Sequence, residues 1–139
     1  MVNFIPQRAA SIGLIILFSL LIVFHGFAIL GVIPYEMLWG GRLTGESQML
    51  VFETISIWLN LIMLGIVVIH AGLWKINISP RITIIALWAM TALFLLNTIG
   101  NLVSKNQLEK MIFTPVTLVL FMLCLRLATA KPPTQDQSQ

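Results

Sequence analysis

Four long apolar segments alternate with short polar segments along the chain. The apolar segments lie at 9–33, 49–71, 82–103 and 112–130, and charged or turn-forming residues bound each of them. Because an α-helix rises about 1.5 Å per residue, about 20 apolar residues cross a hydrocarbon core about 30 Å thick. The pattern therefore predicts an all-α fold, an integral membrane four-helix bundle. Most connections are short, so neighbouring transmembrane helices should pack antiparallel.

Two prolines mark helix boundaries. Pro80 follows Asn77-Ile78-Ser79, a sequence that predicts a cap followed by the start of a helix. Pro115 lies near the beginning of the fourth apolar segment. It either starts that helix or kinks a helix that Met111, Ile112 and Phe113 have already begun, and the sequence leaves both alternatives open.

Composition supports the same fold class. Of the 139 residues, 58% are hydrophobic and 9% are charged, and the mean hydropathy is +0.98. A water-soluble domain of this composition would expose too much apolar surface. The polar segment 131–139 contains Pro132 and Pro133 and predicts a short disordered tail. We expect a single domain over residues 1–139.

The distribution of basic residues predicts the orientation. An even number of transmembrane helices places both termini on one side, and that side carries more Lys and Arg: Arg8, Lys75, Arg81, Arg126 and Lys131, against Arg42, Lys105 and Lys110 opposite. The positive-inside rule then predicts that both termini are cytoplasmic. The net charge of +3 is divided between the two faces, so it indicates no nucleic-acid partner.

Tryptophans suggest interfacial and packing positions. Trp39 and Trp74 lie at opposite ends of the apolar segments, where the amphipathic indole commonly anchors a helix at the membrane surface. Trp58 and Trp88 lie deeper, and we expect them to pack inside the bundle.

Polar residues within the apolar segments gather in the outer half of the membrane. His25 should lie about 12 Å and Glu53 about 6 Å below the outer ends of their helices. Glu53 and Asn60 are seven residues apart and so lie on one helix face. Asn97 and Asn101, four residues apart, share a face of the third helix.

Polar groups within a membrane usually face the bundle interior or a water-filled cavity. The sequence therefore predicts an outward-facing polar pocket roofed by the first loop. Its candidate ligand-binding or coupling residues are His25, Arg42, Glu53, Asn60, Asn97 and Asn101.

Each of these residues also has a structural interpretation. Asparagines in transmembrane helices commonly hydrogen-bond across to a neighbouring helix. His25 can bond a backbone carbonyl, and Glu53 can pair with Arg42 or Lys105.

Other site chemistries have less support. His25 and His70 lie at opposite ends of the membrane, so they cannot ligate one haem from both sides. His25 and Glu53 alone supply two metal ligands where three or four are usual. The single cysteine, Cys124, excludes an intramolecular disulfide. We expect no metal and no cofactor, and no motif of a known enzyme is recognisable.

Several strings carry a resemblance. They are Ile33-Pro34-Tyr35-Glu36-Met37-Leu38-Trp39-Gly40-Gly41-Arg42, Val51-Phe52-Glu53-Thr54-Ile55-Ser56, Leu96-Asn97-Thr98-Ile99-Gly100-Asn101 and Phe113-Thr114-Pro115. In these strings the chain resembles small four-span bacterial membrane proteins of uncharacterised function. The resemblance implies a multi-pass protein of the bacterial inner membrane and implies no activity.

The sequence leaves three functional classes to compare. We expect a binding or accessory component whose partner is a lipid, a small polar ligand, another membrane subunit or a second copy of the chain. The alternative is a small oligomeric transporter with Glu53 as its proton- or cation-coupled carboxylate. A third class, an intramembrane enzyme, would need His25 and Glu53 within reach of a substrate as acid and base.

Overall fold

The protein is a four-helix bundle. The structure, a computed structural model, describes residues 4–104, 106–107 and 109–130, and the predicted disordered tail lies outside them. Its four long helices are α1 (Gln7–Ile29), α2 (Glu46–His70), α3 (Pro80–Leu102) and α4 (Thr114–Ala128). Two 3₁₀ turns, η1 (Tyr35–Met37) and η2 (Trp39–Gly41), lie between α1 and α2, and a π-helical segment, η3 (Glu109–Phe113), precedes α4. The predicted all-α fold class is confirmed.

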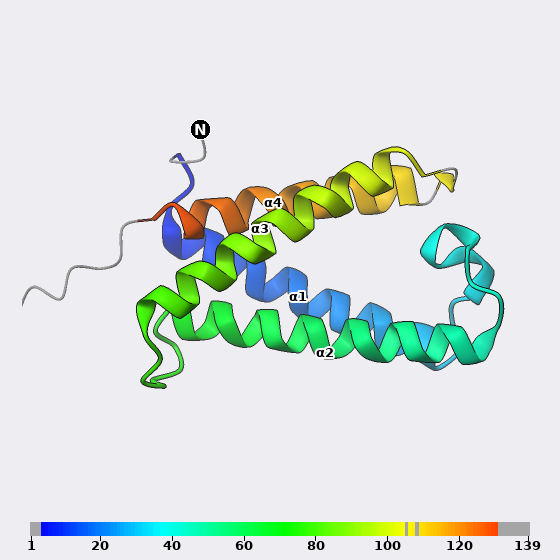
Figure 1. Ribbon diagram of the computed structural model, residues 1–139, viewed down its shortest axis with the longest axis horizontal. Coiled ribbons are helices and arrows are strands. Elements are labelled where there is room, and N and C mark those ends of the chain that lie inside the picture. Colours follow the sequence, from blue (N-terminus) through cyan, green and yellow to red (C-terminus); the bar gives the residue numbers. More distant parts are fainter. Residues whose placement is uncertain (1–3, 105, 108, 131–139) are drawn as a thin grey trace, which may run out of the picture.

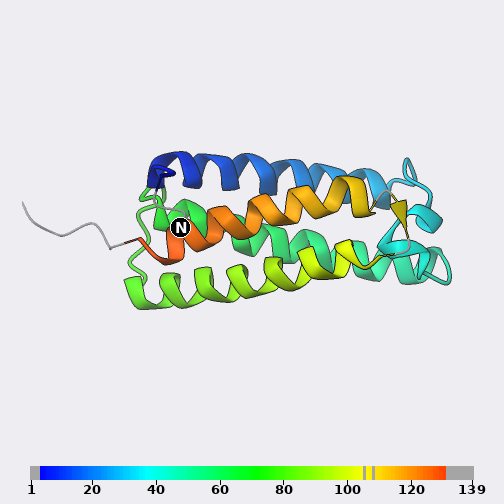
Figure 2. The same ribbon diagram turned by 90° about the horizontal axis from the view of Figure 1, so that it is seen from above.

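Consecutive helices run antiparallel. The ends of α1 and α4 nearest the chain termini lie at one end of the bundle, and the α1–α2 and α3–α4 connections lie at the other (Figures 1 and 2). We call these the terminal end and the loop end. The pairs α1–α2 and α3–α4 pack most extensively, whereas α2 and α3 touch much less. Figure 1 shows why: α2 and α3 lie close at the terminal end and diverge toward the loop end.

The bundle is a multi-pass membrane protein. All four helices are long and apolar enough to cross a bilayer, the fourth over Lys110–Ala128. Large apolar side chains cover their outer faces, as expected when the surrounding medium is lipid. The expectation that Trp58 and Trp88 pack inside is wrong, because they are 64% and 48% exposed. Hydrocarbon accommodates an outward-facing indole that water would not, so burial inside the bundle was not required.

The first helix ends earlier than its apolar segment. It stops at Ile29, where Gly31 adopts a left-handed φ of 73° and the Val32 amide donates to the Phe27 carbonyl at 3.0 Å. This is a Schellman cap, which glycine adopts without the steric cost of a Cβ. The predicted end at Ile33 was wrong because hydrophobicity continued into the loop after the backbone had turned.

The two alternatives for Pro115 are resolved by the π-helical segment. Met111, Ile112 and Phe113 are helical before Pro115, but in the π form, and the α form begins at Thr114. Proline has no N–H and its ring crowds the preceding turn, so a wider turn at this point relieves both problems. Pro115 therefore marks a change of helical form within one transmembrane segment.

Two apolar clusters hold the bundle together. The larger fills the terminal half and includes the fully buried Leu14, Phe18, Val67 and Leu87. The rings of Phe18 and Phe94 lie 5.9 Å apart across it. The smaller cluster, Ala28, Leu38 and Met49, joins the first loop to α1 and α2 at the loop end.

Candidate functional site

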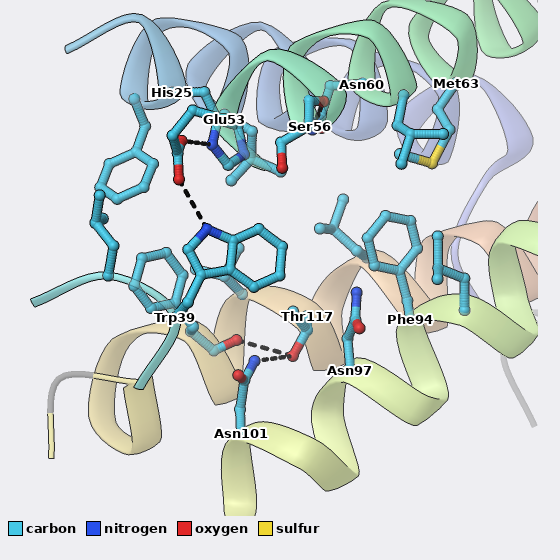
Figure 3. Close-up of a pocket in the computed structure, with 18 residues that line it drawn as sticks. His25, Trp39, Glu53, Ser56, Asn60, Met63, Phe94, Asn97, Asn101 and Thr117 are labelled. Carbon is cyan, nitrogen blue, oxygen red and sulfur yellow. Dashed lines mark hydrogen bonds and ion pairs between the residues drawn. The ribbon is translucent and has the colours of Figure 1, made fainter. Parts of the chain in front are cut away.

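A pocket of about 400 Å³ lies between the α1–α2 and α3–α4 hairpins in the loop half of the bundle (Figure 3). Its polar lining comes from α1, α2, α3 and α4: His25, Glu53, Ser56, Asn60, Asn97, Asn101 and Thr117. Its deep end is apolar and includes Met63, Phe94 and Leu120. Five of the six predicted site residues therefore line one cavity.

Glu53 is the centre of a three-residue hydrogen-bonded group. Its side chain is 1% exposed, and its Oε2 lies 2.5 Å from Nδ1 of His25. The indole N–H of Trp39 donates to Oε1 at 2.8 Å. Both carboxylate oxygens are thus satisfied, as a buried carboxylate requires. In Figure 3, Trp39 projects between the two hairpins beneath Glu53.

The end of α1 and the start of α2 both lie earlier in the sequence than the apolar segments predicted, which explains why His25 and Glu53 meet. Since α1 ends at Ile29 and α2 begins at Glu46, His25 lies about 6 Å and Glu53 about 10 Å from the loop ends of their helices. The depths estimated from the apolar segments had placed His25 deeper than Glu53, which is the opposite order. Among the described residues, Glu53 bonds His25 and Trp39 and does not pair with Arg42. Lys105, the other expected partner, lies outside the described residues.

The roof of the pocket holds a strained backbone. Trp39 has a φ of 52°, and Gly40 and Gly41 follow at 68° and 69°. Glycine tolerates this left-handed region, but a bulky aromatic residue rarely adopts it. The bond to Glu53 and a ring contact with Phe52, at 5.1 Å between centroids, hold the indole in place. Sustained strain of this kind is typical of functional segments.

Asn60 carries an unused hydrogen-bonding atom. Its amide N–H₂ donates to the Ser56 carbonyl of its own helix at 2.8 Å, which fixes the amide orientation. Its Oδ1 is buried and accepts no hydrogen bond from any residue that the structure describes. Asn60 is 6% exposed and lines the pocket. A buried acceptor without a donor is uncommon and needs an explanation.

The two asparagines of α3 differ in their contacts. Asn101 donates to Oγ1 of Thr117 on α4 at 3.4 Å, and Thr98 donates to the same oxygen at 3.1 Å. Asn101 therefore has the structural role expected of an asparagine within the membrane, because it hydrogen-bonds to a neighbouring helix. Asn97 is exposed and has no hydrogen-bond partner within the described part of the chain. Its amide is free at the edge of the pocket.

The exposed lining residues locate the opening. Leu59 on α2 and Leu93 and Asn97 on α3 line the pocket and are exposed, as is Trp39 in the roof. All other lining residues are buried or half-buried. The pocket therefore opens sideways between α2 and α3, which pack less than α1–α2, α3–α4 or α1–α4.

An apolar pocket adjoins this site. It measures about 280 Å³ and lies toward α1 and α4, and the described side chains that line it are all apolar. Phe24 and Phe113 line both pockets, and their rings meet edge to face with centroids 5.4 Å apart. The two rings form a wall between the polar and the apolar pocket.

Arg42 is the predicted site residue that the structure does not bring to the pocket. It is exposed at the end of η2 and is absent from the lining. The sequence predicted that the first loop, which contains Trp39, roofs the pocket, but it did not predict the bond between Trp39 and Glu53 or the contribution of Thr117. The only sequence signal for Thr117 was a hydroxyl group within an apolar segment. Such hydroxyls commonly bond a carbonyl of their own helix, so this signal did not identify Thr117 as a site residue.

The fold and the site together define a multi-pass helical membrane protein with a pocket inside the membrane. No family model, curated protein or solved structure matches the chain. The evidence for its function is therefore the pocket itself.

Proposed function

We propose that the protein is a binding component of a bacterial inner membrane, with both termini cytoplasmic and a ligand held in the pocket of the loop half. The observation that carries this proposal is free hydrogen-bonding capacity at membrane depth. Asn60 Oδ1 and the Asn97 amide lie in a preformed pocket and have no partner among the described residues. Polar groups within a bilayer are costly without partners, and a bound ligand would supply them.

The shape and lining of the pocket support binding. Small-molecule sites are typically concave, largely apolar and provided with a few placed polar groups. Here apolar residues surround the polar residues of α2 and α3, and the hydrogen bonds of Glu53 hold the roof. Since both Glu53 oxygens already accept hydrogen bonds, the role of Glu53 in this proposal is to position Trp39 and His25.

Native mass spectrometry of the full chain, released in mild detergent from the producing cells, tests the proposal. We expect one bound small molecule per chain, and we expect the Glu53→Gln variant to lose it. In Glu53 one oxygen bonds His25 and the other accepts from Trp39, and glutamine replaces one of these two oxygens with an N–H₂ group that cannot accept.

Ser19→Ala is the matched control, because Ser19 is exposed on α1, bonds only its own helix and lies outside the pocket. It should retain the bound molecule. Absence of any bound molecule from the unaltered chain would contradict the proposal, as would equal retention by both variants.

The orientation rests on the five basic residues of the terminal side against three on the loop side. A reporter that is active only outside the cytoplasm should be silent when fused after Gln139 and active when inserted near Gly45. The reverse pattern would place the pocket in the cytoplasmic half.

A small oligomeric proton-coupled transporter is the second candidate, favoured by the buried Glu53–His25 pair. A carboxyl and an imidazole in contact can exchange a proton as a ligand arrives or leaves. Proteoliposomes loaded with a pH-sensitive dye test this candidate. Acidification that requires Glu53 and is lost in Glu53→Gln would favour transport, whereas unchanged internal pH in both would exclude proton coupling.

A further inference from the structure

The sideways opening lies at the depth of lipid chains. Counted along the helices, Leu59 is about 20 Å from the loop end of α2, and Leu93 is about 14 Å from the loop end of α3. The hydrocarbon core is about 30 Å thick, so both residues lie near its middle. A ligand that passes between them comes from the bilayer and not from water.

We propose that the pocket takes a neutral lipid with a free hydroxyl group, which reaches the site from the bilayer between α2 and α3. This inference rests on the proposed binding function and names the chemical class of its ligand. The hydroxyl donates to Oδ1 of Asn60, and the Asn97 amide bonds a second polar atom of the headgroup at the opening.

The unpartnered atoms determine the hydrogen-bonding character of the ligand. Asn60 already donates to the Ser56 carbonyl, so the atom without a partner is the acceptor Oδ1. A carbonyl or ether headgroup, which only accepts, leaves that atom unsatisfied, whereas a hydroxyl both donates and accepts.

The charges around the pocket exclude an anionic headgroup. Among the residues that the structure describes, no Lys or Arg lines the pocket. The acidic Glu53 lies on the same helix face as Asn60, and a phosphate nearby would be repelled by the carboxylate. A neutral headgroup avoids this repulsion and needs no counter-ion.

The apolar surfaces fit the remainder of a lipid. The deep end of the pocket and its Leu59 and Leu93 rim are hydrocarbon, and none of the described side chains that line the adjoining pocket is polar. The polar end of the ligand therefore has hydrogen-bond partners only in the first pocket, next to Asn60 and Asn97.

Quenching of Trp39 fluorescence by brominated lipids tests the proposal. Trp39 lines the pocket, and Trp58, Trp74 and Trp88, which do not, are replaced by phenylalanine to leave Trp39 as the only tryptophan. The chain is placed in phosphatidylcholine bilayers containing increasing amounts of one brominated probe. The probes are dibromo-dioleoylglycerol, its acetyl-capped derivative without a hydroxyl, and the anionic dibromo-phosphatidylglycerol.

We expect saturable quenching by the diacylglycerol at low mole fraction, and only weak, linear quenching by the other two. Asn60→Leu should raise the half-saturating mole fraction about tenfold, since one buried hydrogen bond to the ligand is lost. Circular dichroism and elution volume verify that this variant is folded.

Paired substitutions at the opening test the route. Leu59→Phe with Leu93→Phe narrows the rim and should slow the onset of quenching after the probe is added. Ile62→Phe with Leu96→Phe adds the same bulk one turn further along each helix, at exposed residues outside the pocket, and should leave the rate unchanged.

Equal saturable quenching by the acetyl-capped probe would overturn the requirement for a hydroxyl, and stronger quenching by the anionic probe would overturn the requirement for neutrality. Equal rates in the two paired variants would overturn the route. If no probe quenches saturably, the lipid inference fails. The proposed binding function fails separately, when native mass spectrometry finds no bound molecule.

Discussion

The two halves of this bundle are held together by different interactions. In the terminal half, fully buried apolar residues such as Phe18, Leu87 and Leu127 meet from all four helices. In the loop half, the helices of the two hairpins diverge around a pocket, and the buried contacts include the hydrogen bonds of Glu53. Close packing stabilises the terminal half, whereas a small apolar cluster and a few directional bonds stabilise the loop half. The comparison indicates that the terminal half is the scaffold and the loop half is the site.

Phe18→Ala should have the largest effect on stability. Phe18 is fully buried against Phe94, so truncation leaves a cavity in the scaffold. We expect a loss of about 2–4 kcal/mol, below the upper range for soluble cores because packing, and not transfer from water, drives helix association in lipid. Unfolding by steric trapping in bicelles measures it. Ile16→Ala, at an exposed residue on the same helix, is the control and should have little effect.

Glu53→Leu should rank second and act on the loop half alone. The His25 and Trp39 donors would lose their acceptor, at a cost of about 1–3 kcal/mol. Faster proteolysis between η1 and α2, without faster cleavage between α2 and α3, would confirm that the effect is confined to the roof. Equal loosening of both connections would contradict the division into scaffold and site.

Trp39→Phe should produce a smaller change in the same region. Phenylalanine keeps an aromatic ring beside Phe52 but removes the indole N–H that bonds Glu53. The expected loss is about 0.5–1.5 kcal/mol, measured by the same proteolysis assay. A loss as large as that of Glu53→Leu would show that ring shape, and not the hydrogen bond, holds the roof.

Asn60→Leu should have the smallest effect on stability, near zero or slightly stabilising. It removes a buried oxygen that has no donor among the described residues, and its only hydrogen bond runs to its own helix. Thermal unfolding of the ligand-free protein in detergent tests this. A marked destabilisation would assign Asn60 to the scaffold.

The helices were predictable from the sequence, but their ends and partners were less so. Apolar length predicted all four transmembrane segments, because every spanning backbone must satisfy its own hydrogen bonds as a helix. It overextended the first to Ile33, since hydrophobicity does not register the turn at Gly31. The burial expected for Trp58 and Trp88 also failed, because lipid and protein interior are equally apolar neighbours.

For the site, the sequence determined which polar residues share a helix face and that most of them lie toward the ends of the helices at the α1–α2 and α3–α4 connections. Spacing along one helix is enough for that, as Glu53 and Asn60 illustrate. Only the tertiary structure decided that Glu53 bonds His25 and Trp39, that Asn101 bonds Thr117 while Asn97 stays free, and that the pocket opens between α2 and α3. These facts depend on the rotation and divergence of packed helices. Both are set by the fit of side chains between helices, which no pattern along a single segment contains.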